Sequence, residues 1–593
     1  MNRYFDSRWS GIIHWAGMLA LTVVSPILTS ATSHGSESTR PNIIVIMPDD
    51  QGFGDHGVTG NKVFRTPHID ALAIGSASMT DFYVCPVCSP TRASLMTGRY
   101  HYRTRVVDTF KGRSMMDPTE VTVAELLKEA GYATGIFGKW HLGDNYPLRP
   151  IDQGFEESLI HKGGGLAQPS EPLENRRRYT DPILFRNGKQ VQSEGYCTDV
   201  YFDAAMDFID ECKSEQRPFF IYLPPNAPHG PFHDVPEKLY KYYQTADLKS
   251  LVRGKNGQLD QLARIAAMVE NIDQNVGRLD AHLREQGLFD NTLVFFLVDN
   301  GPNSMRYVGP FRGMKTNVHE GGIRSPLFAR WPARIKAGRK NDRISAHIDL
   351  LPTILEAAGV DAPTDIKVDG RSLLPLLEGR QFAWPDRELV FQVHRGDLPI
   401  PYHHFALRTQ DWKLVHPTGF SKSQMPENVP FELYDMTKDQ GETRDLAAEL
   451  PDRLAELKHA YEVWFEDVST TRSDNFAPPR IIVGADAEPS SSLSPQDWRV
   501  GDAGGWGTAG RWLVHVDHPA KFKAEIVYRE PIGDAEVVLR IGDVRTAGNL
   551  AAHESRLTLD GISLPAGDTT VQVTSVVDGK QRDPYHVVLH RVD

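Results

Sequence analysis

Polar side chains follow four near-continuous apolar runs of the chain, at residues 42–47, 133–137, 219–223 and 292–298. Runs of this kind are typical of strands that are buried on both faces of a parallel sheet. Because ligands of open parallel sheets bind at the carboxyl ends of the strands, the side chains that follow the runs are expected to meet at one edge. We therefore predict an active site that contains these residues: Asp49, Asp50, Lys139, His141, His229, Asp299 and Asn300.

Four of these residues, Asp49, Asp50, Asp299 and Asn300, carry hard oxygen atoms, which favour Ca²⁺ or Mg²⁺ over Zn²⁺ as a bound ion. A single Asp-Asp pair after a strand is more often a turn or a helix cap. The second pair of oxygen ligands, after another apolar run, favours a divalent-cation site. Lys139 and His141 lie two residues apart and are expected beside these carboxylates. We interpret Lys139 as a group that binds an anion and His141 as an acid–base group.

The segment from Cys85 to Arg92, CPVCSPTR, allows two interpretations. Cys85 and Cys88 have the spacing of a redox or zinc motif, but no second cysteine pair supports it, since the remaining cysteines are Cys197 and Cys212. The alternative is the pattern Cys-x-Pro-x-Arg, which runs from Cys88 to Arg92. In that case Cys85 is a hazard, because a disulfide between the two cysteines would block the chemistry described next.

Six motifs together resemble the type I sulfatases of the alkaline phosphatase superfamily. They are DDQG (49–52), CSPTRASLMTGR (88–99), GKWHLG (138–143), NAPHGPF (226–232), DNG (299–301) and RGMKTNVHEGGIR (312–324). In that family's order and spacing, the resemblance covers roughly residues 41–466. Pro48 is a departure, since the family more often has a small residue there.

The resemblance implies that a maturation enzyme oxidises Cys88 to formylglycine. The hydrated aldehyde carries two hydroxyls: one attacks sulfur and forms a covalent sulfate ester, and the other then expels sulfate and restores the aldehyde. The expected reaction is the hydrolysis of sulfate monoesters, with an aryl sulfate or a sulfated carbohydrate as the substrate. A serine lacks the second hydroxyl, which explains why the family converts a cysteine.

The resemblance also assigns roles to individual residues. Asp49, Asp50, Asp299 and Asn300, together with the modified Cys88, resemble the ligands of one divalent cation, usually Ca²⁺ with Mg²⁺ as the alternative. Arg92 and Lys139 resemble stabilisers of the nucleophile. His141 resembles the base that helps to break the sulfated intermediate, and His229 and Lys315 resemble the pair that binds sulfate and protonates the leaving alcohol.

Two other functions compete with this interpretation. Phosphomonoesterases and phosphodiesterases share the scaffold, but they usually use Ser or Thr with two zinc ions, although some phosphonate monoesterases share the Cys88 pattern. A carbohydrate-binding protein with an inactive hydrolase domain is the non-enzymatic alternative. Inactive sites usually lose the groups that Arg92, Lys139 and His141 supply, which argues against it.

The predicted fold is α/β, an alkaline-phosphatase-like sandwich with a large, mostly parallel central sheet flanked by helices. A capping box at Thr122 and Glu125 predicts a helix start, and apolar residues at helical spacing predict a long helix over 262–283. After a polar, proline-rich stretch, short alternating strands predict a C-terminal all-β sandwich. The predicted divisions are a signal peptide (1–31), a linker (32–40), the catalytic domain (41–468), a second linker (469–478) and the β-sandwich (479–593).

Composition limits the partners and the location of the protein. The formal net charge is −12 without a long basic run, so no nucleic-acid partner is expected. Arg3, Arg8 and the apolar residues 11–28 are typical of a secretory signal, with an uncleaved anchor as the alternative. We therefore predict a secreted or periplasmic enzyme with no stable membrane span after cleavage. Trp498, Trp506 and Trp512 are candidates for stacking on sugars, although buried tryptophans are more common.

Overall fold

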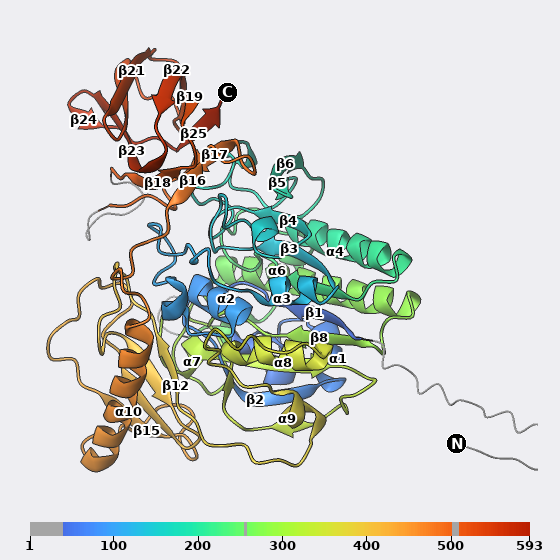
Figure 1. Cartoon of the computed structure of the whole chain (residues 1–593). Coiled ribbons are helices and arrows are strands. Elements are labelled where there is room, and N and C mark those ends of the chain that lie inside the picture. Colours follow the sequence, from blue (N-terminus) through green and yellow to red (C-terminus); the bar gives the residue numbers. More distant parts are fainter. Residues whose placement is uncertain (1–39, 254–257, 501–508, 593) are drawn as a thin grey trace, which may run out of the picture. The chain divides into compact units, whose positions relative to one another are not determined.

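The four apolar runs form the centre of one large sheet (Figure 1). Strand β1 (Asn42–Ile46) pairs in parallel with β7 (Phe219–Leu223) and with β8 (Thr292–Phe296), and β7 pairs in parallel with β3 (Ala133–Lys139). Every residue of these four strands is buried, as strands covered on both faces must be. The predicted parallel α/β core is therefore confirmed.

The structure is a computed structural model that describes residues 40–253, 258–500 and 509–592. The predicted signal peptide and residues 32–39 of the predicted linker lie outside this part. Within it, the central sheet has eleven strands in the order β10-β2-β9-β8-β1-β7-β3-β4-β5-β6, with β11 beside β2. The remaining strands of this sheet are β2 (Ala77–Tyr83), β4 (Glu157–His161), β5 (Ile183–Arg186), β6 (Lys189–Gln192), β9 (Arg324–Arg330), β10 (Lys340–Asn341) and β11 (Ser345–Ala346).

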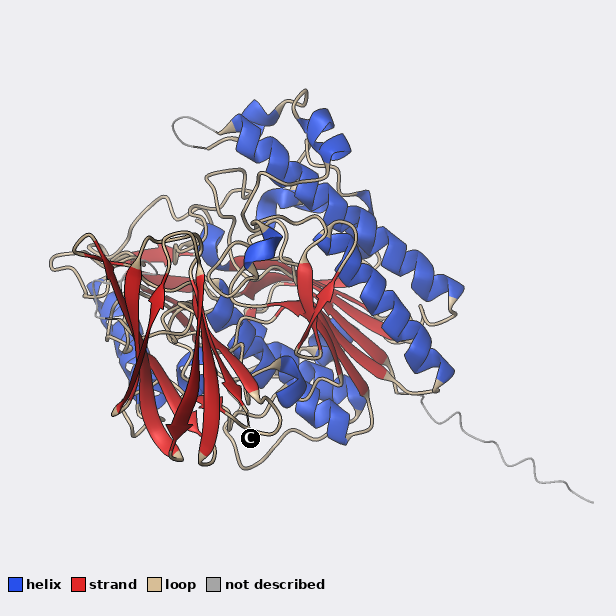
Figure 2. Cartoon of the chain, turned by 90° about the horizontal axis from the view of Figure 1, so that it is seen from above, coloured by secondary structure: helices blue, strands red, loops and turns tan. Residues whose placement is uncertain are grey.

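Helices cover both faces of this sheet (Figure 2). Because alternate residues of a strand point to opposite faces, Ile43 and Val45 pack with one group of helices, and Ile44 and Ile46 pack with the other. The first group contains α2 (Cys88–Thr97), α3 (Val123–Glu129), α8 (Leu350–Ala358) and α9 (Leu374–Glu378). The second group contains α1 (Pro67–Ile74), α4 (Cys197–Ser214) and α6 (Leu259–Glu285), and α5 (Glu237–Tyr243) packs on α6.

The two helices predicted from local patterns are confirmed. Thr122 caps α3, with its side chain accepting from the backbone N–H of Glu125 and the Glu125 carboxylate accepting in return. Helix α6 buries the apolar stripe that predicted it, from Leu262 to Leu283. Cys197 and Cys212 are both buried thiols of α4.

A smaller antiparallel sheet follows the central sheet along the chain. Its strands are β12 (Leu389–Gln392), β13 (Phe405–Arg408), β14 (Trp412–His416) and β15 (Glu432–Asp435), in that order. Helix α10 (Pro451–Ser469) packs Leu457 and Tyr461 against it. A very short helix, α7 (Glu320–Ile323), precedes β9.

The C-terminal residues form the predicted all-β sandwich. One sheet has the order β16-β18-β23-β20-β21 with β24 beside β23, and the other has the order β17-β25-β19-β22. The strands are β16 (Ile481–Val483), β17 (Ser490–Leu493), β18 (Trp512–Val516), β19 (Ala520–Val527), β20 (Ala535–Ile541), β21 (Val544–Leu550), β22 (Arg556–Leu564), β23 (Gly567–Val577), β24 (Lys580–Gln581) and β25 (His586–Arg591). The sequence missed the short strands β16, β17 and β24, and also β21, whose residues are mostly polar or small because it lies at a sheet edge. The residue limits of the domains stay predictions.

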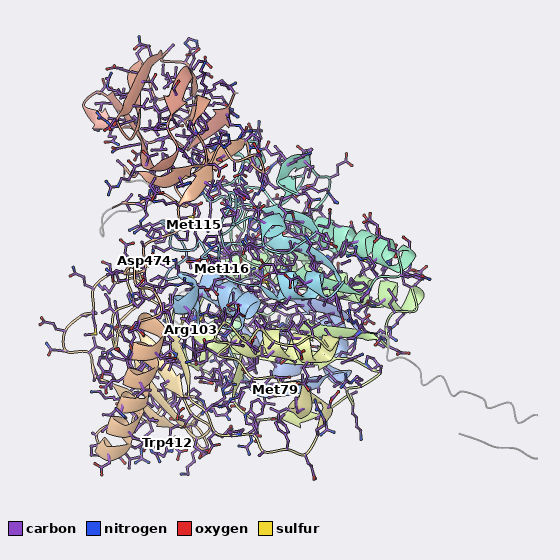
Figure 3. All side chains as sticks on the ribbon, in the orientation of Figure 1. Met79, Arg103, Met115, Met116, Trp412 and Asp474 are labelled. Atoms are coloured by element: carbon purple, nitrogen blue, oxygen red, sulfur yellow. The ribbon has the colours of Figure 1, made fainter. Side chains whose placement is uncertain are left out.

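The sandwich shares its apolar core with a loop of the preceding region. Met115 and Met116 (Figure 3) are adjacent in sequence, yet Met115 belongs to the core of the sandwich and Met116 to the core beneath the central sheet. Trp498 and Trp512 are buried in the sandwich core, so neither presents a face to a sugar, and Trp506 lies outside the described residues. Among the described residues, no helix is long and apolar enough to span a membrane.

Candidate active site

Helix α2 presents Cys88 as its first residue. Ser89 and Pro90 follow in the first turn, where a missing backbone N–H is tolerated, and the Ser89 hydroxyl donates to the backbone oxygen of His141 at 3.1 Å. The unpaired N–H groups at such a helix start favour a negatively charged ligand. Gly98, with φ +66°, ends the helix in the left-handed conformation that favours glycine.

The two cysteines of the segment face different partners. Cys85 Sγ lies 3.5 Å from His347 Nε2, whereas Cys88 Sγ lies 3.4 Å from His141 Nδ1. Both thiols are free, so Cys85 and Cys88 do not form the disulfide that would block the chemistry. Burial raises the pKa of the Cys85 thiol. This division between two environments disfavours the redox or zinc interpretation.

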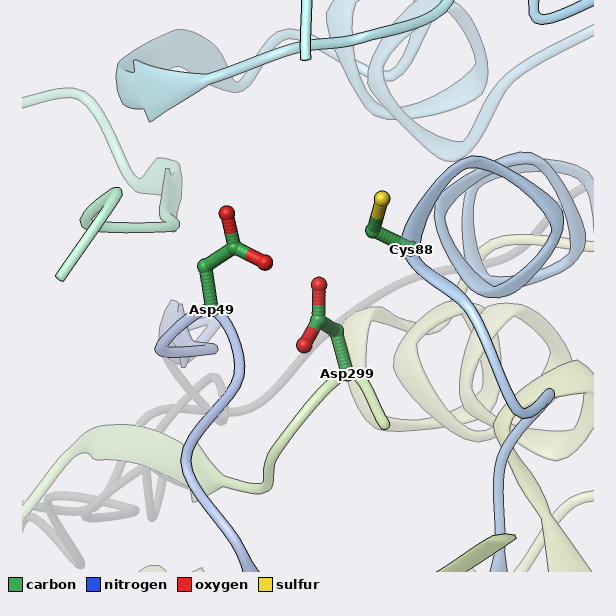
Figure 4. Close-up of side chains that lie close together, drawn as sticks. All are labelled: Asp49, Cys88 and Asp299. Atoms are coloured by element: carbon green, nitrogen blue, oxygen red, sulfur yellow. The ribbon is translucent and has the colours of Figure 1, made fainter. Parts of the chain in front are cut away.

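Acidic residues that follow β1 and β8 lie close to Cys88, and Figure 4 shows the side chains of Asp49 and Asp299 beside it. One ligand atom from each of Asp49, Cys88 and Asp299 lies within 4.8 Å of the others. The Asn300 amide donates to Asp50 Oδ1 at 2.9 Å, and the Asp50 backbone N–H donates to Asp299 Oδ1 at 3.1 Å. Among the described residues, the buried oxygens Asp49 Oδ1 and Asn300 Oδ1 have no hydrogen-bond partner. Buried oxygens without donors fit a hard divalent cation.

Three cations, of which Arg92 and Lys139 are fully buried and Lys315 is partly exposed, balance the three carboxylates of this site. Lys139 Nζ lies 2.6 Å from Asp49 Oδ2, Arg92 Nη2 lies 2.9 Å from Asp299 Oδ2, and Lys315 pairs with Asp50. Arg92, Lys139, Asp49 and Asp299 have no exposed side-chain surface.

The charges of the site perturb its pKa values in both directions. Burial alone would raise the pKa of Asp49, but Lys139 and the neighbouring cations outweigh it and hold that pKa well below its usual range. Burial, together with the charge of Asp49, raises the pKa of Asp299 to about 7. Burial opposes the charged form of Lys315, yet Asp50 raises its pKa overall.

Hydrogen bonds fix which nitrogen of each site histidine carries a proton. His141 Nε2 lies 2.9 Å from the backbone oxygen of Thr109, which can only accept, so Nε2 donates and the Nδ1 lone pair faces Cys88. His229 Nδ1 likewise donates to the Gly230 oxygen at 2.8 Å, and its Nε2 lies 3.8 Å from Asp50 Oδ2. Burial lowers the pKa of both rings, and Lys139 lowers that of His141 further, so both are neutral bases.

A pocket of about 220 Å³ opens above these groups. Cys88, His141, His229 and Lys315 line it, while the remaining predicted site residues lie beneath. The structure thus brings together all ten predicted side chains, from segments up to 265 residues apart. Their individual roles stay predictions.

Sequence reasoning missed the outer wall of the pocket, to which Phe110, Gln168, Arg395 and Phe420 contribute. Arg395 lies between two rings, 4.3 Å from the centroid of Phe110 and 4.5 Å from that of Phe420, and it pairs with Asp108. These residues come from loops without motif spacing or periodicity, so the sequence offered no signal for Phe110, Arg395 and Phe420.

The mixed sheet and the site at its edge fit the alkaline-phosphatase-like fold that the motifs implied. Comparison with known families is more specific: the Sulfatase family model matches residues 41–360, and the model of the N-sulphoglucosamine sulphohydrolase C-terminal region matches residues 313–461. The chain therefore belongs to the sulfatase family and is a sulfuric ester hydrolase, as its motifs predicted.

Similar proteins agree with this assignment. N-acetylgalactosamine-6-sulfatase of Canis lupus familiaris is 34% identical over 408 residues, which are 63% of this chain and 73% of that protein. The crystal structure of Ps i-CgsB in complex with k-i-k-neocarrahexaose superposes with a TM-score of 0.63 at 28% identity, covering 73% of this chain and 94% of that one. A structure of a protein in complex with its substrate D-glucosamine-2-N,6-O-disulfate superposes with a TM-score of 0.60 at 25% identity, covering 74% and 100%.

Proposed function

We propose that this sulfatase hydrolyses sulfate monoesters of sulfated carbohydrates, with a formylglycine derived from Cys88 as its nucleophile. The observation that supports this proposal most directly is the position of Cys88. It is the first residue of a helix and lines the pocket. Its Sγ faces the His141 Nδ1 lone pair and lies within 4.8 Å of ligand atoms of Asp49 and Asp299. The conversion requires a formylglycine-generating maturation enzyme as a partner.

The residues around position 88 support a two-step reaction. One hydroxyl of the hydrated aldehyde gives its proton to Asp299 and attacks sulfur, while the ester oxygen leaves with a proton from the Lys315 ammonium. His229, which is neutral in this structure, would share the donor role once it has taken up a proton. The neutral His141 then takes the proton of the second hydroxyl, the bond to sulfate breaks, and the aldehyde re-forms. Lys139 and Arg92, both fully buried, stabilise the oxygens of the hydrated aldehyde at residue 88 by their positive charge.

Asp49, Asp50, Asp299, Asn300 and the modified residue 88 would hold a single hard cation, Ca²⁺ or Mg²⁺. When bound, such an ion supplies positive charge that offsets the negative charge of the sulfate ester. The two orphaned oxygens in this cluster support the proposal independently of the family. Elemental analysis should find one calcium or magnesium ion per chain, and two zinc ions would instead favour a phosphatase.

The pocket wall supports a sugar ring as the leaving group. Flat aromatic faces suit the apolar faces of sugars, and the Arg395 guanidinium supplies several donors for hydroxyl or acidic groups. The relatives named above act on or bind sulfated carbohydrates according to their names and titles. Hydrolysis of defined sulfated saccharides, compared with aryl sulfate and aryl phosphate, tests this proposal together with peptide mass spectrometry at residue 88.

We also propose a secreted or periplasmic location, which rests on the signal-like residues 1–31 of the sequence. Cell fractionation of the full-length chain, with N-terminal sequencing of the mature protein, tests the location and the cleavage together. Recovery of an uncleaved chain in the membrane fraction would favour the anchor instead.

A further inference from the structure

Gln496, a residue of the C-terminal β region, contacts the loop that hydrogen-bonds to the active-site residue His141. Its side chain is buried, and its Nε2 donates to the backbone oxygen of Thr109 at 2.8 Å and to the Ser114 hydroxyl at 3.3 Å. The same Thr109 oxygen accepts from His141 Nε2 at 2.9 Å. One carbonyl thus joins Gln496 to the histidine that faces residue 88.

The hydrogen bonds settle how the Gln496 amide is oriented. The Thr109 oxygen can only accept, so Gln496 must present its NH₂ group, since its carbonyl there would repel. Gln496 Nε2 and His141 Nε2 lie 3.4 Å apart because both are donors that converge on one acceptor with two lone pairs. Gln496 therefore acts on the histidine through Thr109 and not by direct bonding.

The loop that carries Thr109 is held from two sides: Arg395 pairs with Asp108 and donates to the Thr109 hydroxyl, and the C-terminal region makes the contacts that follow. Gly112 donates its backbone N–H to the Gln496 oxygen at 3.0 Å, and the Arg499 guanidinium donates to the Lys111 oxygen. A side chain at Gly112, with φ +68°, would lie 3.0 Å from the Asp497 oxygen, so the two segments touch backbone to backbone. The loop also carries Phe110 of the pocket wall.

A buried oxygen without a hydrogen-bond partner indicates that Gln496 does more than fill space in the core. Among the described residues, Gln496 Oε1 is buried without a hydrogen-bond partner. Such an atom destabilises the fold relative to an apolar side chain of the same shape. Gln496 also lies beyond residues 360 and 461, where the matches to the two family models end.

We propose that Gln496 is a positioning residue of the sulfatase reaction: it holds the Thr109 carbonyl against His141 Nε2 and so keeps His141 Nδ1 directed at residue 88. The C-terminal β region is then a part of the catalytic unit. This inference rests on the proposed function, in which His141 removes the proton that allows sulfate to leave.

The test compares two variants of the full chain. Gln496→Met keeps the length of the side chain but removes its donor. Asn145→Ala is the matched control, because Asn145 is also buried and joins the same two regions through two hydrogen bonds with Ser492, at 3.0 and 3.1 Å. Asn145 bonds to Ser492 and, within the described part of the chain, makes no hydrogen bond to the loop that carries Thr109.

For Gln496→Met we expect kcat on an aryl sulfate to fall about 10- to 100-fold, with KM changed by no more than about twofold. A fall in activity of this size is usual when a residue that supports a site side chain through a hydrogen bond is replaced. The enzyme should accumulate in its sulfated form at residue 88, which peptide mass spectrometry after a rapid acid quench detects. Asn145→Ala should keep kcat within about twofold, without that accumulation. Amide hydrogen exchange of residues 109–112 should quicken only in Gln496→Met.

Two results would overturn the inference: an unchanged kcat in Gln496→Met, or an equal fall in both variants, which would indicate general loosening of the junction. If Gln496→Met does not fold, Gln496→Ala carries the same comparison. Failure of the proposed function has a separate signature, since an active wild-type enzyme without formylglycine at residue 88 would refute it whatever Gln496→Met does.

Discussion

The buried pair between Lys139 and Asp49 offers a test of the cation site that does not depend on turnover. Both side chains have no exposed surface, and their charged atoms lie 2.6 Å apart. Replacing Lys139 with Met removes the nearest partner of Asp49 and leaves Arg92, 4.0 Å away, as its ion-pair partner. Removing one partner of a buried pair destabilises a protein by about 3–5 kcal/mol, and the remaining arginine places this variant near the lower value.

A bound cation should reverse most of that loss. If Asp49 is a ligand, the ion supplies the positive charge that Lys139 no longer provides. A single opposite charge at roughly 4 Å is worth about 4 kcal/mol at an effective dielectric constant of 20, comparable with the loss. The difference in unfolding free energy between wild type and Lys139→Met should therefore be large in chelator and small in saturating calcium.

The assay is urea unfolding of both proteins, in chelator and in calcium. Lys413→Met is the matched control: Lys413 is equally buried and pairs with Glu320 at 2.9 Å and Glu442 at 2.7 Å, none of which belongs to the cation site. Its deficit should be of similar size and independent of calcium. An equal deficit of Lys139→Met in chelator and in calcium would refute Asp49 as a ligand.

Three further outcomes are expected. Cys88→Ser should be sulfated once and then stall, because serine lacks the second hydroxyl; mass spectrometry detects the adduct, and repeated turnover would contradict the mechanism. Burial lowers the pKa of His347 to about 3, below the unfolded value of 6.5. The unfolded state therefore binds the extra proton, and stability falls as pH drops from 6.5 towards 3 by up to about 1.4 kcal/mol per pH unit. Urea unfolding of His347→Gln should show a shallower slope over that range, and parallel curves would argue against the assignment. A chain ending at residue 478 should lose solubility and activity, because it exposes the buried Met115 and Leu148; a soluble, active product would contradict this.

Local patterns in the sequence predicted the central elements of the fold and the residues of the candidate site. Apolar runs and helical spacing depend on neighbours within a few residues, so they predicted β1, β3, β7, β8 and α6. The motif residues were placed correctly at one edge because parallel strands present their carboxyl ends together. The sandwich was also foreseen, although its polar edge strand β21 was not, since one apolar face at an edge leaves little alternation to detect.

Tertiary structure alone decided which groups meet and how each is oriented. Lys315 and Asp50 pair across 265 residues, and Arg395 reaches its place between Phe110 and Phe420 through loops that have no period. Gln496 lies 355 residues from His141, and its effect depends on one backbone oxygen that both side chains share. Spacing along a chain encodes contacts within an element, whereas contacts between distant loops depend on how the whole core packs. The sequence therefore predicted which residues belong to the candidate site, and the fold determined which partners each of them meets.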